Sequence, residues 1–307
     1  MKTLFINIAL VFMMTGIGIS DNEAIYILHS NNTNGALENC YCPDHPLGSL
    51  EKRVEFVKSF LRAHPNTIIV DAGDLFSPVY RPLKDSLVAE AYKLIPYDAI
   101  LPGDQELTRG QIYQEKLLRN TGADLVLSNY SSEWLPGMLS KKIIMRGGKK
   151  IAILGLLSER AFRYYPNEVK KAMSVHDPVS IIQPMINDLK KDVDVIILLT
   201  HQGFDADKEL AEKLSGVDVI IGSHSQTTVM KPQEANVTII TQAGKNGYYM
   251  GVVKLSFNGI GEISSKTGWL EAMTLEMPDN PKVMRLIKEY EEKSGLVNRA
   301  KKRYKHP

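Results

Sequence analysis

The chain has 307 residues, of which 44% are hydrophobic and 23% are charged. This composition is typical of a globular protein, and it excludes a disordered, collagen-like or coiled-coil chain. The 37 basic and 35 acidic residues leave a net charge of +2, which is too small an excess to indicate a polyanionic partner. We therefore expect no nucleic acid among its partners.

The first 20 residues have the pattern of a signal peptide. Lys2 supplies a positive charge, residues 4–19 are largely apolar, and the small residues Gly18 and Ser20 suit a cleavage site. An uncleaved anchor is the alternative, although the apolar run is short for a membrane span. No other stretch is long and apolar enough to cross a bilayer. We therefore predict an exported protein, periplasmic or extracellular, whose main domain covers residues 21–275.

From residue 24 onward, short apolar runs alternate with amphipathic stretches, which predicts an α/β protein. The first half reads as a βαβαβ series, so its strands should be parallel with right-handed crossovers. Later runs are separated by turns alone, which predicts antiparallel strands and therefore mixed sheets. The predicted strands cover residues 24–29, 67–71, 98–101, 124–127, 151–157, 193–199, 217–221, 237–241 and 250–257. The predicted helices cover residues 47–63, 83–94, 110–120, 178–190 and 205–214.

The C-terminal segment, residues 276–307, is predicted to form a helix and a basic tail. The helix should begin at Pro281, which suits a first helical position, with Asn280 as its cap, and should reach residue 300. The tail is expected to be solvated, and a contact with a polyanion is the alternative. Its basic residues are Arg299, Lys301, Lys302, Arg303 and Lys305.

Polar residues gather directly after the predicted strands. In open α/β sheets, ligands bind in the crevice outside the carboxyl ends of the strands. Carboxylates, imidazoles and amides delivered to one crevice predict a metal site, and the imidazoles favour manganese, iron or zinc. The six polar segments are 29–35 (HSNNTNG), 71–74 (DAGD), 103–106 (GDQE), 200–203 (THQG), 222–226 (GSHSQ) and 241–247 (TQAGKNG).

In this order, the six segments resemble the motifs of the 5′-nucleotidase branch of the calcineurin-like metallophosphoesterases. The resemblance covers about residues 24–257, and the GSHSQ and QAG blocks are its most specific parts. It implies two mixed β-sheets packed face to face and flanked by helices, a four-layer fold, with a dinuclear metal centre at the edge of the sheets. It also implies hydrolysis of a phosphate ester by a metal-activated water, with both metals stabilising the developing charge.

The resemblance also implies roles for the residues that match the motifs. Asp74 would bridge the two metals, and His201 and His224 would bind the second metal. Gln226 would bind the first metal.

Four positions depart from the family's pattern. Its first motif is Asp-x-His, whereas this chain has Asn32 and Asn34, so two ligands of the first metal become amides. Its third motif is Gly-Asn-His-Glu, and here Asp104 replaces an amide ligand of the second metal. Gln105 stands where the family keeps a catalytic histidine that contacts the phosphate and assists the leaving group. We therefore count Asp104 and Gln105 among the candidate catalytic residues.

These exchanges keep two carboxylates in the centre but move one of them toward the second metal. We therefore predict one tight site for a divalent transition metal (manganese, iron or zinc) and one weak site that is held mostly by neutral amides. The alternative is a polar network that satisfies itself and binds no metal. The tight set is Asp74, Asp104, His201 and His224, and the weak set is Asn32, Asn34, Asp74 and Gln226.

The two cysteines, Cys40 and Cys42, form a C-x-C pair in the loop after the altered first motif. In an exported protein such a pair is expected to be oxidised, and so small a ring would stabilise the fold little. Two alternatives remain open. The pair could act as thiolate ligands for a metal or cofactor, with His45 as a third donor, or both thiols could be free.

Three other polar residues are expected to have structural roles. His29, at the end of the first predicted strand, is expected to be a structural side chain within the sheet. Lys52 and Arg53 open a predicted helix and are expected to lie on its solvated face.

The leading functional prediction is an exported hydrolase that cleaves a phosphate or related ester, with reduced or altered activity. The rival is a non-catalytic protein on the same scaffold that holds a metal, a cofactor or an envelope protein partner. Gln105 motivates the rival, because an amide cannot act as a general acid. The chain stops at Pro307, so we expect the second, base-stacking domain of the two-domain nucleotidases to be absent and carry over no nucleotide preference.

Overall fold

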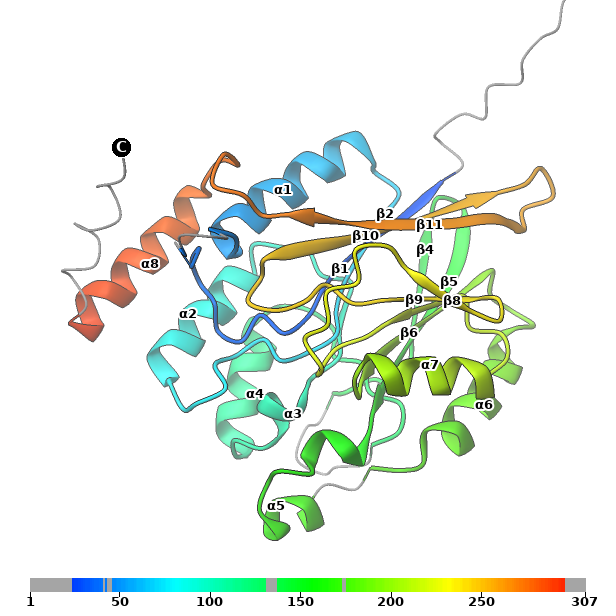
Figure 1. Ribbon diagram of the computed structural model, residues 1–307, viewed down its shortest axis with the longest axis horizontal. Helices are drawn as coiled ribbons and strands as arrows, with labels where there is room; N and C mark the ends of the chain where they lie inside the picture. The colour runs from blue at the N-terminus through cyan, green and yellow to red at the C-terminus, as the bar shows by residue number, and fades with distance from the viewer. Residues whose placement is uncertain (1–23, 41, 43–45, 131–136, 173–174, 296–307) are drawn as a thin grey trace, which may run out of the picture.

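The computed structural model describes residues 24–40, 42, 46–130, 137–172 and 175–295 (Figure 1). The predicted signal peptide and the basic tail lie outside these residues. Two sheets lie face to face in the described part, and helices cover their outer faces (Figure 1). This is the four-layer α/β arrangement that the sequence predicted.

The first sheet has five strands in the order β11-β10-β1-β2-β3. Strand β1 lies at its centre, parallel to β2 and antiparallel to β10. The sheet is therefore mixed, as predicted. Its strands are β1 (Ile25–Ser30), β2 (Thr67–Asp71), β3 (Ala99–Ile100), β10 (Tyr249–Phe257) and β11 (Ile263–Ala272).

The second sheet has six strands in the order β4-β5-β6-β7-β9-β8. Its four inner strands run parallel, and the two edge strands β4 and β8 are antiparallel to their neighbours. Its strands are β4 (Lys142–Arg146), β5 (Lys149–Leu157), β6 (Val195–His201), β7 (Val219–Ile221), β8 (Gln233–Ala235) and β9 (Thr238–Thr241).

Helices cover both outer faces of the sandwich. Four pack on the first sheet: α1 (Leu50–Ala63), α2 (Pro82–Tyr92), α4 (Gln111–Asn120) and α8 (Pro281–Ser294). Two pack on the second sheet: α6 (Pro178–Leu189) and α7 (Phe204–Lys213). Three short helices lie in the connections: α3 (Asp104–Leu107), the 3₁₀ helix η2 (Glu159–Phe162) and α5 (Asn167–Ala172).

The alternation of side chains along β1 (IYILHS) shows why its first four residues are all apolar or aromatic. Ile25 and Ile27 point into the core between the two sheets, whereas Tyr26 and Leu28 point into the core beneath the helices. Successive side chains of a strand face opposite ways, so a strand covered on both faces needs apolar residues at every position.

The sequence missed strands that carry little apolar signal. Strand β4 alternates between half-buried and exposed residues, and β11 lies at the edge of its sheet with several polar residues. The predicted strand at 124–127 is reduced to isolated bridges, such as the one that pairs Leu125 with Ile100. At the C-terminus the predicted cap is confirmed, because the Asn280 side chain accepts hydrogen bonds from the amides of Lys282 and Val283.

The expectation that Lys52 and Arg53 lie on a solvated face is wrong. Both are buried, because the first turn of α1 packs beneath other segments of the chain. Lys52 Nζ forms an ion pair with Asp279 Oδ1 at 2.6 Å. Arg53 donates hydrogen bonds to the hydroxyls of Tyr92 and Tyr97, each at 3.3 Å. Both side chains therefore tie α1 to other parts of the first layer.

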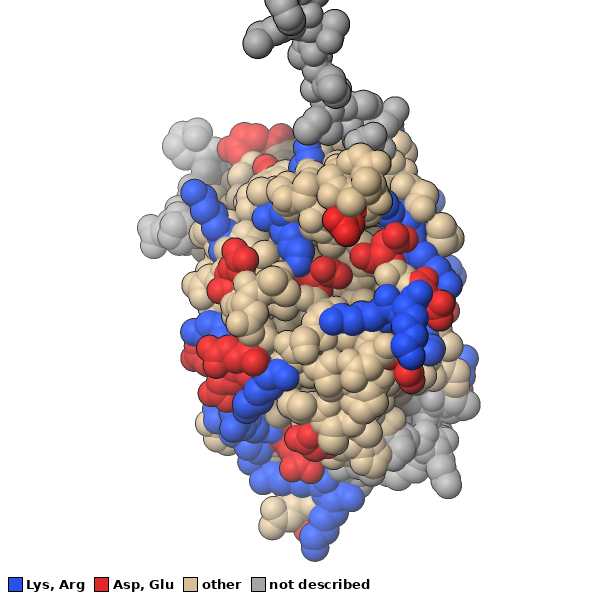
Figure 2. All heavy atoms as spheres, turned by 90° about the vertical axis from the view of Figure 1, so that its right-hand side faces the viewer, with Lys and Arg blue, Asp and Glu red and all other residues tan. Residues whose placement is uncertain are grey.

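The surface in Figure 2 carries charges of both signs. On this face, Lys and Arg side chains lie among Asp and Glu side chains rather than in one continuous basic band (Figure 2). Within the described ranges, every helix is too short or too polar to cross a membrane.

Candidate metal centre

Four predicted metal ligands meet where strands of both sheets end. Asp74 lies in the loop after β2, and Asp104 begins α3 after β3. His201 is the last residue of β6, and His224 lies in the loop after β7. One ligand atom from each of the four residues lies within 4.8 Å of the others. Two carboxylates from the first sheet thus face two imidazoles from the second.

Asp104 lies at the centre of this group. Its Oδ1 is 2.8 Å from Nε2 of His201 and 3.0 Å from Nδ1 of His224. His201 Nε2 also lies 3.4 Å from Oδ1 of Asp74. The other ring nitrogen of His201, Nδ1, is 2.9 Å from the carbonyl oxygen of Ala72. A carbonyl oxygen only accepts, so Nδ1 carries the hydrogen, and Nε2 faces the two carboxylates.

This arrangement requires positive charge at His201 Nε2. A neutral ring with hydrogen on Nδ1 would direct the lone pair of Nε2 at two anionic oxygens. Burial alone would lower the pKa of His201, but the charges of Asp74 and Asp104 raise it well above its usual value. Either a proton or a metal ion can supply the missing charge. Two carboxylates and two imidazoles form a donor set that suits a divalent transition metal, so the residues present fit such an ion.

Glu106 holds the two acidic loops in place. Its carboxylate accepts hydrogen bonds from the backbone amides of Asp74, Leu75 and Phe76 at 2.9–3.0 Å, and from that of Gly103 at 2.8 Å. A β-carbon at position 103 would lie 2.5 Å from Asp74 Oδ1, so only glycine fits at this position. Glu106 accepts from the amide of Gly103 at the N-cap of α3, but glycine has no side chain to complete a capping box, so the sequence carried no such signal for Glu106.

The side-chain amide of Asn32, which replaces the first-motif carboxylate, is hydrogen-bonded to other residues of the protein. Asn32 Oδ1 accepts hydrogen bonds from the Ser223 hydroxyl at 3.0 Å and from the backbone amide of His224 at 3.2 Å. Its Nδ2 donates to the carbonyl oxygen of Gly244 at 3.2 Å. Both lone pairs of the amide oxygen are therefore used, and Asn32 links the first sheet to the loop that carries His224.

Two other predicted residues, Asn34 and Gln105, lie beside the same cluster. Gln105 Nε2 donates to Asn34 Oδ1 at 3.0 Å, and Asn34 Nδ2 donates to Asn246 Oδ1 at 3.2 Å. Gln105 is buried, and its backbone amide donates to Asp74 Oδ1 at 3.3 Å. Gln226 is exposed. The structure thus places Asn34 and Gln105 in a chain of amides beside the acidic pair.

The sequence did not point to Tyr165, which also contacts the centre. Its hydroxyl donates a hydrogen bond to Asp104 Oδ2 at 2.7 Å. Burial and the charge of Asp104 raise the pKa of Tyr165, so the phenol keeps its proton. Tyr165 lies outside all six polar segments and belongs to no recognisable spacing, so no local signal marked it.

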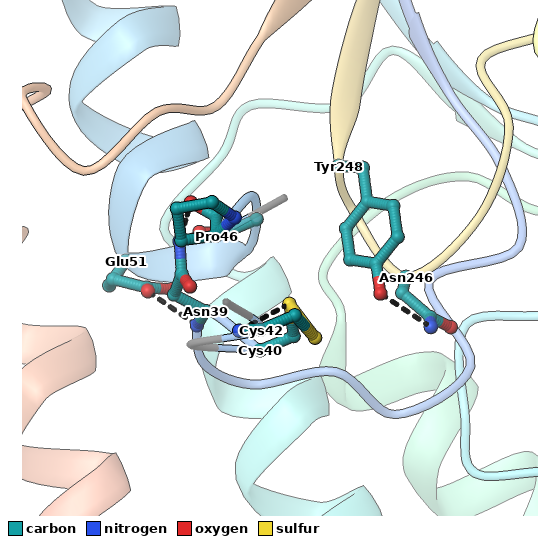
Figure 3. The surroundings of a disulfide bond; sticks show 8 residues. Asn39, Cys40, Cys42, Pro46, Glu51, Asn246 and Tyr248 are labelled. Carbon is teal, nitrogen blue, oxygen red and sulfur yellow. Dashed lines mark hydrogen bonds between the residues drawn. A yellow bond between two sulfur atoms is a disulfide. The ribbon is translucent and has the colours of Figure 1, made fainter. Parts of the chain in front are cut away.

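Cys40 and Cys42 are joined in a disulfide, which is the first of the three alternatives considered above (Figure 3). Asn39 braces the loop, because its Nδ2 donates to the carbonyl oxygens of Pro46 and Gly48 and its backbone amide donates to Glu51. In this oxidised state neither sulfur is a thiolate ligand. His45 lies outside the described residues.

Known proteins resemble this chain in sequence. The model of the calcineurin-like phosphoesterase family matches residues 28–227. Human 5′-nucleotidase is 26% identical over 84% of this chain and 50% of its own length. The apyrase of Aedes albopictus is 23% identical over 92% of this chain and 55% of its own length. The chain therefore spans about half the length of these curated relatives.

Solved structures share the fold. The 5′-nucleotidase precursor of Thermus thermophilus has a TM-score of 0.76 at 22% identity and covers 89% of this chain, which spans 59% of it. The calcineurin-like phosphoesterase YfkN of Bacillus subtilis has a TM-score of 0.71 at 20% identity. The match covers 88% of this chain and 97% of YfkN. Both likenesses place the described domain in the same two-sheet architecture.

Proposed function

Because the chain belongs to the calcineurin-like phosphoesterase family, we propose that it is a metal-dependent hydrolase of a small phosphate ester. The observation that carries the proposal is the cluster of Asp74, Asp104, His201 and His224, whose ligand atoms lie within 4.8 Å of one another. These four side chains would hold a divalent transition metal. When bound, such an ion activates water and stabilises negative charge on a phosphoryl group.

The surrounding residues prepare the site for that chemistry. Glu106 holds the loops of Asp74 and Asp104 through backbone hydrogen bonds, so both carboxylates keep their positions. Gln105 and Asn34 present amide groups beside the carboxylates. An amide hydrogen can bind a phosphate oxygen but cannot protonate a leaving group. Hydrolysis without a general acid should therefore be slow and should favour esters with good leaving groups.

The hydrolase proposal is tested with an aryl phosphate and a bis-aryl phosphodiester in the presence of manganese. The unmodified protein should release the aryl alcohol, and His201→Ala should lose at least 100-fold, since changes outside the ligand shell already cost roughly 10–100-fold. His64→Ala, a histidine at the end of α1, serves as the matched control. Turnover equal in the unmodified protein and His201→Ala would overturn the proposal.

We further propose one tight metal site and one weak site. Asn32 Oδ1 already accepts two hydrogen bonds and has no lone pair left for an ion, and Asn34 Oδ1 accepts one from Gln105 and has one left. The tight site retains both carboxylates and both imidazoles. Elemental analysis of the purified protein should therefore find close to one tightly held transition metal per chain.

The metal count is checked in a Cys40→Ser/Cys42→Ser background, which removes any contribution from sulfur. Asp104→Asn should release the tight metal. Asn32→Asp in combination with Asn34→His should raise the count toward two, because it restores a carboxylate and an imidazole. Two tightly bound metals in the Cys→Ser background alone would show that amides suffice.

A non-catalytic binding protein is the second candidate, and Gln105 favours it. Gln105→His would introduce a group that can donate a proton to the leaving group, and such catalysis typically contributes about 10²–10⁴ in rate. A gain of this size, seen with a poor leaving group and absent with a good one, supports an enzyme that lacks only its acid. Unchanged rates together with a co-purifying protein partner support the binding role.

Export completes the proposal. An oxidised Cys40–Cys42 pair suits an oxidising compartment, and such a compartment is the one that a signal peptide at residues 1–20 would reach. Mass spectrometry of the protein purified from its native cells should find a chain that begins near residue 21. A chain that still carries Met1–Ser20 would favour an uncleaved anchor instead.

A further inference from the structure

Tyr165 reaches the metal centre from a segment outside the six polar motifs. It lies after η2, in the connection that leaves β5. Its backbone amide donates to the carbonyl oxygen of Phe162 at 2.9 Å, and the two rings lie 6.1 Å apart, centre to centre. Phe162 is buried in the core between the sheets. The backbone and ring of Tyr165 are thus fixed against the core, and its hydroxyl has a defined position.

The Tyr165 hydroxyl makes the two carboxylate oxygens of Asp104 inequivalent. Oδ2 accepts the hydrogen bond of Tyr165 at 2.7 Å, whereas Oδ1 faces the ring nitrogens of His201 and His224. A hydrogen bond to a carboxylate is charge-assisted and roughly twice as strong as a neutral one. Because a carboxylate has two equivalent oxygens, its own chemistry does not decide which of them faces a metal. Here the hydrogen bond from Tyr165 occupies Oδ2 and leaves Oδ1 facing the two histidines.

We propose that Tyr165 is a positioning residue that holds Asp104 as a single-oxygen metal ligand through Oδ1. The inference rests on the proposed metal centre. Without the phenol, the Asp104 carboxylate is free to turn and offer both oxygens to the ion. The geometry that His201 and His224 require would then be lost, and the ion would be held less tightly. Groups that orient ligands in this way typically contribute about 10–100-fold to metal affinity.

The test compares Tyr165→Phe with Tyr164→Phe, which makes the same chemical change at an exposed neighbouring residue. Chelator-treated protein is titrated with Mn²⁺ in a calorimeter. Tyr165→Phe should bind Mn²⁺ about 10–100-fold more weakly than the unmodified protein, and Tyr164→Phe should bind equally well. Equal Mn²⁺ affinity in Tyr165→Phe and the unmodified protein would overturn the proposal.

A spectroscopic measurement distinguishes positioning from a general loss of structure. Co²⁺ in a four-coordinate site absorbs visible light more strongly than Co²⁺ with five or six ligands. If the freed carboxylate adds its second oxygen, the Co²⁺ form of Tyr165→Phe should absorb more weakly at full loading, while the unmodified protein and Tyr164→Phe share one spectrum. Identical spectra for all three would contradict the single-oxygen assignment.

A double-mutant cycle shows whether Tyr165 acts through Asp104. In an Asp104→Ala background, the weaker Mn²⁺ binding left to Asp74, His201 and His224 is titrated at higher Mn²⁺ concentrations. There Tyr165→Phe should change Mn²⁺ affinity less than about 2-fold, since the carboxylate that it orients is gone. A full loss in that background would refute action through Asp104. If Tyr165→Phe folds poorly, Tyr165→Met keeps an apolar side chain without the hydroxyl and takes its place. None of these readouts requires hydrolysis, so failure of the hydrolase proposal remains distinguishable.

Discussion

His29 is a buried histidine whose two ring nitrogens have no hydrogen-bond partner among the described residues. It lies on β1 directly opposite Gly251 of β10, and a β-carbon at Gly251 would lie 1.9 Å from His29 Nε2. The glycine therefore leaves room for the imidazole. Burial lowers the pKa of His29 to about 3. The folded protein thus keeps this ring neutral at pH values where the unfolded chain protonates it.

This difference predicts a loss of stability in mild acid. The folded pKa lies below the unfolded value of 6.5, so the neutral ring's contribution is fully present above pH 6.5 and is lost as the pH falls toward 3. At pH 5 the loss is about 2 kcal/mol. His29→Leu removes this proton linkage. The free energy of unfolding of His29→Leu, relative to the unmodified protein, should therefore rise by about 2 kcal/mol between about pH 7.5 and pH 5 in urea titrations. A difference in unfolding free energy between the two proteins that stays constant with pH would contradict this prediction.

At the residue scale, the sequence identified side chains that are metal-ligand types and also directly follow a predicted strand. Asp74, Asp104, His201 and His224 follow strands in the order of known motifs, and the structure brings them together. Tyr165 escaped notice because its role depends on where a distant loop packs. Arg53 and Lys52 were misassigned for a related reason, since a charged pair on a helix shows nothing of the segment that later covers it.

Among the elements, α3 has a structural importance that its length hides. Glu106, in this helix, fixes the loop after β2 through three backbone amides and the start of α3 through a fourth. The two loops that carry Asp74 and Asp104 are therefore joined by one side chain. Burial and the charge of Asp74 raise the pKa of Glu106 to about 8, but backbone N–H groups only donate, so the four contacts favour a carboxylate that accepts at both oxygens.

Glu106→Gln should accordingly destabilise the protein by about 2–3 kcal/mol, because its amide nitrogen would face backbone donors in a buried site. The free energy of unfolding from urea titration measures this change. Glu115→Gln, which alters only an ion pair with Arg119 on the surface of α4, should cost less than about 1 kcal/mol. Equal, small losses in both variants would show that the Glu106 carboxylate does not hold the loops.

Elements with a strong apolar signal could be predicted, and those without one could not. The inner strands β1, β2, β5 and β6 are buried at nearly every position because both faces are covered, and each contains a run of at least three apolar residues. Edge strands such as β11 bury little, so their sequence resembles that of a loop. The two-residue strand β3 falls within the strand predicted at 98–101, whereas the four-residue helix α3 is too short for any helical period to show.

For the molecule as a whole, the proposed ion should add stability by joining the two sheets. A ligand that binds only the folded state stabilises it by about 2.7 kcal/mol at 100 times its dissociation constant. For a domain of this size, that corresponds to a rise in melting temperature of roughly 5–10 °C. Removing metal with a chelator should reverse the rise. His224→Ala should melt at the same temperature with and without Mn²⁺; a metal-dependent shift in that variant would argue against binding at this centre.

The origin of the four ligands in two separate sheets has a consequence for how the protein matures. A chain that has folded only its first βαβαβ portion would present Asp74 and Asp104 without an imidazole, which is a set that transition metals bind poorly. The imidazoles arrive only when β6 and β7 have docked, and contacts between such distant parts of a chain form late and slowly. Metal capture would therefore come after assembly of the sandwich, so that only correctly folded molecules acquire the ion.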